Sequence, residues 1–355
     1  MQKQRIAYID ISKFIAVLFV LVSHTQYYIP VSNNFMKLRV IWIAFFLPIF
    51  FLTVGLTSSH ILDAKFSTYV NKKVKGILVP YIIWCFILNF GGFQGLTFFK
   101  AMIIGNVQSL DSVYINSIIW FLPAFFTASL IFYLTCLSEK TISEKIKCNF
   151  TYIKIALIAI LIVFDRAINR FLGPDCVFGI SSAFQGAALM MIGNLCSRML
   201  SRIYEMINAR KAAIAATALI LGIVLAYVNM PLTTYDGKVG YTHAIWMAKG
   251  YIGLNVFTYL GTAILSSIGI LVISMLLEKV RFLSYLGKHS LLFMTMHIYT
   301  HSILTTHLSG VISTIPSEFI RIMVFVLLSA TLITCTFPFI DRYMPFLYKP
   351  INNSR

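Results

Sequence analysis

Asp10, Lys13 and His24 are the first polar residues in the chain whose types and spacing could do chemistry. They lie in YIDISKFIAVLFVLVSH, residues 8–24, which is otherwise largely apolar. At 100° per residue, Lys13 and His24 are about 20° apart around a helix, and Asp10 and His24 about 40°. One helical face would therefore carry an ammonium group that can bind phosphate and an imidazole that can accept a proton near neutral pH. The two groups would lie about 16 Å apart along the axis.

This polar face has a functional and a structural interpretation. Ionisable groups within a membrane helix face the interior of a bundle or a water-filled cavity, and they indicate function. The structural alternative places His24 at the outer headgroups beside Tyr27 and Tyr28, with the Lys13 side chain extending to the opposite surface. Helix geometry alone leaves both interpretations open.

Ser290, His297 and His301 form a second polar face. Their spacings of seven and four residues bring all three to one side of a helix. They suit either the polar lining of a substrate cavity or plain hydrogen bonding between helices. The spacing of His297 and His301 also fits a metal site, but the glutamate of a zincin motif and any nearby carboxylate are absent. We therefore expect no metal.

Further candidates have weaker support. Lys72, Lys73 and Lys75 could bind an anionic substrate, although lysines are ordinary in a loop beside a membrane. Asp165 could orient His24 or contact a substrate, or simply pair with Arg166 at the surface. Trp120 could line the cavity or serve only in packing. The aromatic and polar residues of the stretch 227–251 suit sugar binding, but aromatic residues also collect at membrane interfaces.

The elements that position these residues are membrane helices. The 355 residues are 59% hydrophobic and only 12% charged, whereas an average soluble domain has roughly 25% charged residues. The net charge of +17 is explained by basic cytoplasmic loops, and no soluble segment is long enough to bind nucleic acid. The six cysteines contain no C-x-x-C pair, so neither a disulfide framework nor a zinc site is expected.

The hydropathy pattern predicts an all-α, polytopic bundle of about ten transmembrane helices. A helix needs about 20 residues to cross the hydrocarbon core. Residues 96–105 are too short to span it. Asp10 and Lys13 interrupt a signal-like start, so we expect a retained first span. One membrane domain over residues 1–355, with no fused soluble domain, is expected. The predicted spans lie near residues 11–28, 40–57, 76–93, 115–135, 153–169, 178–197, 212–229, 252–277, 290–308 and 319–340.

Basic residues predict the orientation. With both termini cytoplasmic, most of the 29 lysines and arginines fall on the cytoplasmic side. The removal of one helix would invert every later loop and spoil this asymmetry. The exceptions on the outer side would be Lys37, Arg39, Lys100, Arg166, Arg170, Lys238, Lys249 and Arg321. His24 would then lie in the outer half of the membrane, with Lys13 near the cytoplasmic surface.

Several segments, in order, resemble the acyltransferase-3 family of integral membrane acyltransferases. The first helix has a basic residue, ten further residues and then a histidine, as Lys13 and His24 do. The resemblance covers most of the chain. Its further segments are FFLPIFFLTVGL (45–56), NKKVKGILVPYIIW (71–84), IIWFLPAFF (118–126), MMIGNLCSR (190–198) and FLSYLGKHSLLFMTMH (282–297).

The resemblance implies O-acyl transfer, usually of acetyl, from cytoplasmic acetyl-CoA to a hydroxyl of an extracytoplasmic or lipid-linked surface glycan. Such a protein would be a multi-pass protein of the bacterial inner (plasma) membrane. His24 would be the general base, with a transient acyl-histidine as the alternative. Lys13, Lys72, Lys73 and Lys75 would bind the phosphates of the donor. The substrate-contacting candidates are Asp10, Asp165, Ser290, His297, His301 and Trp120.

The chain also departs from the family pattern. Lys13 stands where arginine is frequent, and the lysines at 72, 73 and 75 only approximate an Arg-x-x-Arg pair. Lysine keeps the charge but loses the bidentate geometry of arginine. Phe293 and Met294 replace a typical Ile-Tyr.

Three other classes of function compete with acyl transfer. A transporter or flippase of lipid-linked sugars would have about ten helices too, but no inverted repeats or paired broken helices are evident. A glycan polymerase would be expected to carry a long outer loop with several arginines. An intramembrane sensor or structural protein would not need the polar face of Lys13 and His24.

Overall fold

The computed structural model describes the protein in residues 5–89, 96–105, 119–146, 149–173, 176–229, 234–235, 238–239, 245–247 and 250–349. The described chain is almost wholly helical, as expected, with four two-residue strands. The chain divides into two compact units, each assembled from segments far apart in the sequence. The single membrane domain expected over residues 1–355 stays a prediction.

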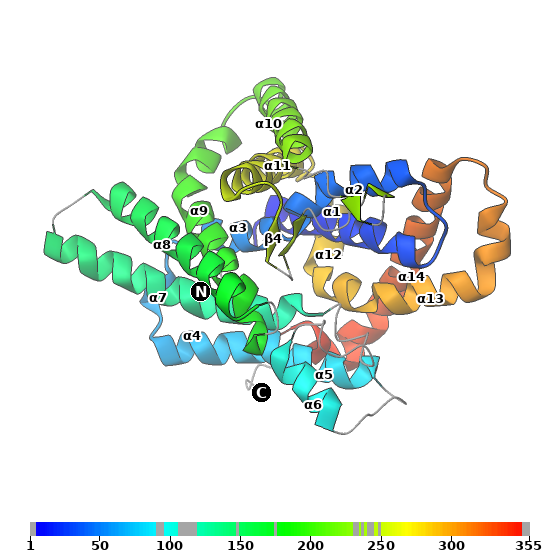
Figure 1. Ribbon diagram of the computed structural model, residues 1–355, viewed down its shortest axis with the longest axis horizontal. Helices are drawn as coiled ribbons and strands as arrows, with labels where there is room; N and C mark the ends of the chain where they lie inside the picture. Colours follow the sequence, from blue (N-terminus) through cyan, green and yellow to red (C-terminus); the bar gives the residue numbers. More distant parts are fainter. Residues whose placement is uncertain are drawn as a thin grey trace. The chain divides into compact units, whose positions relative to one another are not determined.

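Unit 1 comprises residues 1–50, 201–246 and 252–344. Helix α1 contacts most of the other helices of this unit, and α10 lies along α11 (Figure 1). Its helices are α1 (Ala7–His24), α2 (Asn33–Phe46), α10 (Asn208–Val228), α11 (Val256–Leu276), α12 (Arg281–Lys288), α13 (Ser290–Ser313) and α14 (Glu318–Tyr343). Strands β1 (Thr234–Tyr235) and β2 (Lys238–Val239) pair antiparallel, and β3 is Ile245–Trp246.

Unit 2 comprises residues 51–200, 247–251 and 345–355. Its helices include α3 (Pro48–Leu56) and α9 (Ile180–Tyr204), each of which extends past the boundary between the units. The others are α4 (Phe66–Lys73), α5 (Val79–Leu88), α6 (Leu96–Ile104), α7 (Phe121–Ile146) and α8 (Phe150–Phe171). Strand β4, Tyr251–Ile252, extends past the boundary as well.

Several helix starts are fixed by local hydrogen bonds that the sequence encodes. Ser32, Asn149, Asn255 and Ser317 each precede a helix and accept a backbone N–H from its first turn. Such caps satisfy donors that have no partner within the helix. The same residue types therefore begin α2, α8, α11 and α14.

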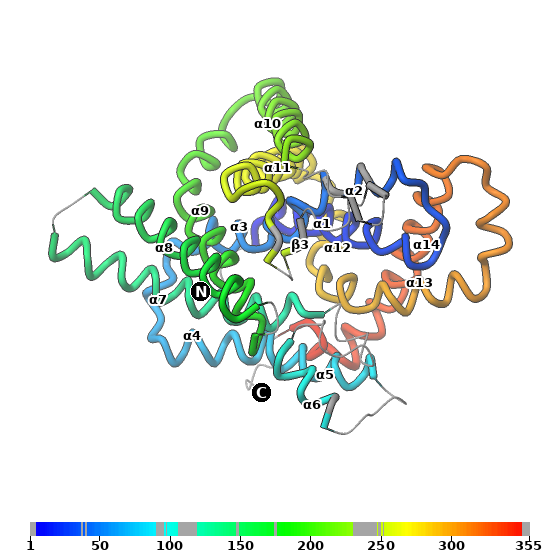
Figure 2. Tube along the Cα trace, viewed as in Figure 1, coloured from blue at the N-terminus to red at the C-terminus, as the bar shows by residue number. Residues whose placement is uncertain are grey.

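A close contact of the α1 and α12 backbones sets the position of the first helix. A Cβ at Gly287 would lie 1.9 Å from the carbonyl oxygen of Asp10, so only glycine permits this approach. The paths of α1 and α12 run side by side in Figure 2. Ile11, Val17 and Leu21 of α1 are fully buried in the same unit. This packing fixes the helix that carries Asp10, Lys13 and His24.

Two glycines allow α3 and α9 to cross closely in unit 2. A Cβ at Gly55 would meet the carbonyl oxygen of Met190 at 1.8 Å, and one at Gly193 would meet that of Leu52 at 2.2 Å. Small residues at a crossing let membrane helices approach backbone to backbone. Phe51 packs its ring on Phe121 and Phe125, at centroid distances of 5.3 and 5.2 Å.

Each predicted span has a helical counterpart, with some differences of extent. The span predicted at 40–57 is divided into α2 and α3 directly before Pro48, which has no N–H to continue the helix. The span at 76–93 corresponds to a π-helical segment, Val74–Leu78, followed by α5. The predicted ends at residues 90–93 and 115–118 lie outside the described residues.

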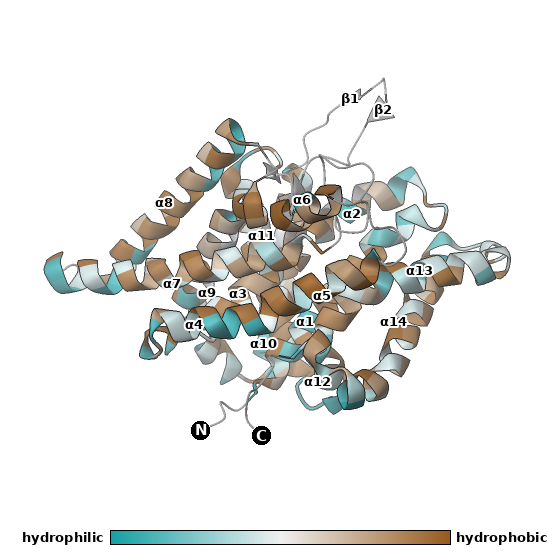
Figure 3. Cartoon of the chain, turned by 90° about the horizontal axis from the view of Figure 1, so that it is seen from below, coloured by the Kyte–Doolittle hydropathy of each residue, from teal (hydrophilic) through white to brown (hydrophobic). Residues whose placement is uncertain are grey.

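Seven of the described helical segments are long and apolar enough to cross a membrane. Hydrophobic residues cover most of α5, α8 and α11, whereas α4 has a hydrophilic portion (Figure 3). The ten-helix count and the cytoplasmic termini stay predictions. Helix α13 is not among the seven, and it carries three histidines and many serines and threonines.

Candidate functional site

The candidate site in unit 1 is centred on α1. The predicted helix through Asp10, Lys13 and His24 is confirmed, because α1 is continuous from Ala7 to His24. Asp10 is buried, and Lys13 and His24 are half-buried. The polar residues of α1 therefore face protein for much of their surface.

The two charged residues at the start of α1 have different surroundings. The Asp10 carboxylate lies 3.0 Å from Nε of Arg5, whose own side chain is exposed. Lys13 forms no ion pair or hydrogen bond with the residues that the structure describes. Its ammonium group is consequently available to an anion from outside the chain.

His24 has one ring nitrogen held by its own helix. Its Nδ1 lies 2.8 Å from the Val20 carbonyl oxygen. A carbonyl can only accept, so Nδ1 carries the proton and Nε2 presents a lone pair. This tautomer is the one that a general base needs.

His297 lies directly against His24. The two ring centroids are 4.8 Å apart, with an angle of 57° between the planes. His297 is fully buried. Its Nδ1 lies 3.2 Å from the Phe293 carbonyl oxygen, and its Nε2 has no hydrogen-bond partner within the described chain. The second predicted polar face thus meets the first at this pair of imidazoles.

His301 has a partner at both ring nitrogens. Its Nε2 lies 3.2 Å from the Leu21 carbonyl oxygen, and its Nδ1 lies 3.0 Å from Oγ of Ser329. Thr300 contacts the same serine hydroxyl. The ring of Tyr28 packs edge-on against His301 at 5.3 Å. His301 therefore connects α13 to α1 and α14, and coordination of a metal would break this network.

Ser290 lies apart from the histidines. It is the first residue of α13 and is half-buried. Seven residues of helix separate it from His297 by about 10 Å along the axis. The structure thus brings His297 and His301 to α1 and leaves Ser290 at the start of α13, about two turns before His297.

The sequence reasoning missed a histidine–carboxylate pair in the same unit. His289 Nε2 lies 3.2 Å from Asp341 Oδ2, and the His289 ring stacks on Phe337 at 4.2 Å. Ser329 was missed as well, since no periodic pattern marks a single serine in an apolar helix. For His289, the one available signal in the sequence was its position between Lys288 and Ser290.

In unit 2, the basic residues between α4 and α5 have three different environments. Lys72 is exposed, and Lys75 is half-buried within the π-helical segment. The Lys73 ammonium lies 5.2 Å from the ring centroid of Tyr69 and 5.7 Å from that of Phe125. Burial raises the pKa of the Tyr69 phenol, whose hydroxyl donates to the Ser129 carbonyl. Lys73 is therefore held by aromatic faces, while Lys72 extends into solvent.

Asp165 in α8 belongs to a buried polar cluster of unit 2. Its Oδ2 accepts hydrogen bonds from the Arg166 guanidinium, with Nε at 2.8 Å. Arg166 also donates to the Gly250 carbonyl at 2.8 Å, and Asn169 donates to the Asp165 and Ser181 carbonyls. The ion pair is thus present, and its carboxylate is buried rather than at the surface.

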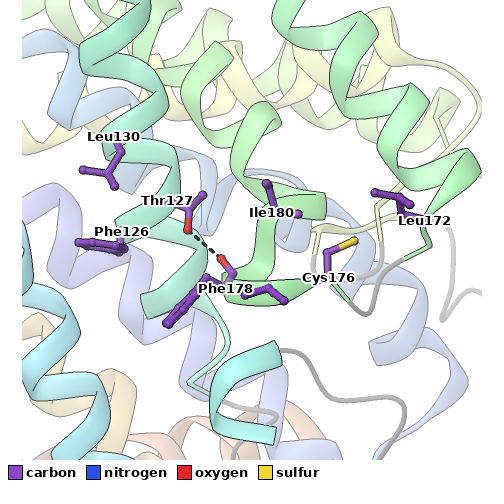
Figure 4. Close-up of a pocket in the computed structure, with 8 residues that line it drawn as sticks. Phe126, Thr127, Leu130, Leu172, Cys176, Phe178 and Ile180 are labelled. Atoms are coloured by element: carbon purple, nitrogen blue, oxygen red, sulfur yellow. Dashed lines mark hydrogen bonds between the residues drawn. The ribbon is translucent and has the colours of Figure 1, made fainter. Parts of the chain in front are cut away.

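Trp120 is buried directly before α7, and its ring packs edge-on against Phe121 at 6.2 Å. An open, mainly apolar cavity of about 640 Å³ lies elsewhere in unit 2. Figure 4 shows Thr127 donating to the Phe178 carbonyl at its edge. Its lining residues are Phe126, Thr127, Leu130, Leu172, Cys176, Val177, Phe178 and Ile180, none of which the sequence singled out.

The expectations about the stretch 227–251 and about metal binding can be compared with only part of the chain. Most of the stretch 227–251, including Asp236, Tyr241 and His243, lies outside the described residues. Within the part of the chain that is described, no group of three or more His, Cys, Asp or Glu residues could hold a metal ion.

A family model described as an acyltransferase domain, acyltransferase-3, matches residues 6–340. The comparison with curated proteins and the comparison with solved structures each gave no match.

Proposed function

The chain belongs to the acyltransferase-3 family and is an integral membrane acyltransferase, and from this we propose a specific reaction. The protein transfers an acyl group, in the first place acetyl, from cytoplasmic acyl-CoA to a hydroxyl of an extracytoplasmic or lipid-linked surface glycan. The proposed location is the inner (plasma) membrane of a bacterium.

The orientation of His24 is the observation that carries this proposal. With Nδ1–H donated to Val20, Nε2 is free to accept a proton. The acceptor hydroxyl loses its proton to Nε2 while its oxygen attacks the thioester carbonyl. The C–S bond then breaks, and the proton passes to the departing CoA thiolate. Proton transfer by such a base contributes about 10²- to 10⁴-fold to a rate.

Lys13 is the proposed donor contact in unit 1. The phosphates of CoA need cationic partners, and the Lys13 ammonium group forms no ion pair or hydrogen bond within the described chain. Its distance from His24 along α1, about 16 Å, suits a donor whose phosphates stay near the cytoplasm while its thioester enters the bundle. Lys72, Lys73 and Lys75 are proposed as further phosphate contacts in unit 2.

The acceptor side of the proposal rests on the remaining polar and aromatic candidates. Asp10, Asp165 and Ser290 offer groups for hydroxyl recognition, and Trp120 offers a ring for sugar packing. His297 lies against the base, and His301, one turn further along α13, would border the reacting hydroxyl. Exclusion of water by the bundle would protect the thioester from hydrolysis.

Acyl transfer in isolated membranes tests the proposal. Labelled acetyl-CoA is added to membranes that carry the protein and an extract of lipid-linked and surface glycans. We expect labelled glycan with the wild type and a loss of about 10²-fold or more with His24→Ala. His307→Ala is the matched control, because His307 is an exposed histidine of α13.

Equal labelling by the wild type and His24→Ala would reject the general base. If no acyl-CoA of any chain length supported transfer, the donor assignment would fall, and transport of a lipid-linked sugar would become the better account. The acyl-histidine alternative predicts a stoichiometric burst of free CoA in the absence of acceptor, whereas direct transfer predicts none.

A further inference from the structure

The three histidines that meet at α1 and α13 differ in how their ring nitrogens are satisfied. His301 has a partner at both nitrogens, within a network that includes Ser329 and the Leu21 carbonyl. His24 has a partner at Nδ1 and is half-buried. His297 is fully buried and has a partner at Nδ1 only. His297 is therefore the one of the three that keeps an unsatisfied nitrogen away from solvent.

The unsatisfied nitrogen of His297 is an acceptor. Its Nδ1 faces the Phe293 carbonyl, which can only accept, so Nδ1 carries the proton and Nε2 holds a lone pair. A buried acceptor without a donor costs free energy, and native proteins keep few of them. A protein would retain such an unsatisfied acceptor if its hydrogen-bond donor forms only during the reaction.

His24 is the group placed to become that donor. The two imidazoles are in contact, with centroids 4.8 Å apart. In the resting protein both Nε2 atoms are acceptors, so neither can donate to the other. When His24 takes a proton on Nε2 it gains an N–H, and the lone pair of His297 then has a partner.

We propose that His297 is a positioning residue for the acyl transfer, whose Nε2 accepts a hydrogen bond from the newly protonated Nε2 of His24. This inference rests on the proposed function, and it extends it from a single base to a pair of histidines. His297 stays neutral throughout. The proton moves from the acceptor hydroxyl to His24 and from there to the CoA thiolate.

The surroundings of His24 give this contact its importance. Within the described chain, no carboxylate forms an ion pair with His24. A Ser-His-Asp triad uses an aspartate to stabilise the imidazolium, and here neutral acceptors must serve instead. The Val20 carbonyl contacts one side of the ring, and His297 supplies the acceptor for the new N–H. A fixed dipole of this kind acts strongly where water is excluded.

Two substitutions at position 297 separate the proposed contact from simple packing. Asparagine can keep the amide donor toward Phe293 but has no acceptor at the position of Nε2. Glutamine reaches that position with its carbonyl oxygen. We expect His297→Asn to lower kcat about 10²-fold with the KM for acyl-CoA and for acceptor unchanged, and His297→Gln to recover most of this loss.

The measurements are made on the purified full-length protein, with kcat expressed per folded molecule. His307→Asn and His307→Gln are the matched controls on the same helix, and we expect both to retain wild-type kcat. A His297→Asn variant with wild-type kcat would overturn the inference. Equal loss in the asparagine and glutamine variants with a raised acceptor KM would overturn it too, because that result makes His297 a substrate contact.

His24→Ala, measured alongside, separates this inference from the function on which it rests. Loss of transfer with His24→Ala but not with His297→Asn would support His24 as the general base and reject the proposed hydrogen bond between the two histidines. Full activity of His24→Ala would reject the base, and the proposed hydrogen bond would fall with it.

Discussion

At the scale of single residues, the chemistry depends on which polar groups are already satisfied. Asp10 is paired with Arg5, and Asp165 with Arg166, so neither carboxylate is free. His301 is engaged at both nitrogens. Within the described chain, Lys13 forms no ion pair or hydrogen bond, and His24 forms one hydrogen bond, through Nδ1. Lys13 and His24, toward the two ends of one helical face, therefore each keep a charged or basic group that forms no ion pair with the described residues.

Lys13→Ala tests the donor contact. We expect the KM for acyl-CoA to rise about tenfold, which corresponds to about 1.4 kcal/mol, because one charge-assisted contact to phosphate is lost. Lys13→Arg keeps the charge and should stay close to the wild type. Steady-state kinetics with varied acyl-CoA measure the effect.

Lys279→Ala is the control, since Lys279 is an exposed lysine in the same unit. An unchanged KM for acyl-CoA in Lys13→Ala would contradict the phosphate contact. A fall in kcat alone would instead place Lys13 near the reacting atoms.

At the scale of the elements, close backbone contacts hold the helices in position. Gly287 brings α12 against α1 at Asp10, one turn before Lys13. Gly55 and Gly193 do the same for α3 and α9. Polar contacts then connect helix ends, as where both the backbone N–H and the hydroxyl of Ser32 bind the carboxylate of Glu318. The site on α1 thus depends on a glycine that has no chemistry of its own.

Gly287→Ala should destabilise the protein by about 1–3 kcal/mol, because the added methyl group forces α12 away from α1. Thermal unfolding in detergent measures the change. Gly310→Ala is the matched control, since nothing lies within 4 Å of a Cβ at Gly310 in α13. That control should leave stability unchanged or raise it by up to about 1 kcal/mol. Equal midpoints for both variants would contradict the tight contact at Gly287.

At the scale of the whole molecule, several polar contacts within each unit join segments that the prediction places on the same side of the membrane. In unit 1, Pro30 and Ser32 contact Arg321 and Glu318, and both segments are predicted to lie outside. Tyr204 donates to Glu278, and both are predicted to lie inside. In unit 2, Ser58 and Lys154 both contact Asn194 at predicted inner ends. None of these contacts joins two segments that are predicted to lie on opposite sides of the membrane.

Cysteine labelling in intact cells tests that topology. In a chain without native cysteines, Asn33→Cys and Thr314→Cys should react with a membrane-impermeant maleimide from outside. Glu205→Cys should react only after permeabilisation. All three positions are exposed. Protection of Thr314→Cys together with labelling of Asn33→Cys would show that the number of spans between them is not the even count that ten helices require.

The sequence by itself determined the class of the protein, its helices and the polar face of α1, because hydropathy and the 3.6-residue period are local properties. The sequence predicted both the family and the first helix, which carries Asp10, Lys13 and His24. It did not determine which polar groups are satisfied, since Arg5, Ser329 and Asp341 reach their partners only through packing. The contact of His24 with His297 joins residues 273 positions apart in sequence, and the orphaned Nε2 follows from the burial around it. Only the tertiary structure decided that His301 has a partner at both ring nitrogens while Nε2 of His297 has none among the described residues, because burial and long-range contacts are set by packing.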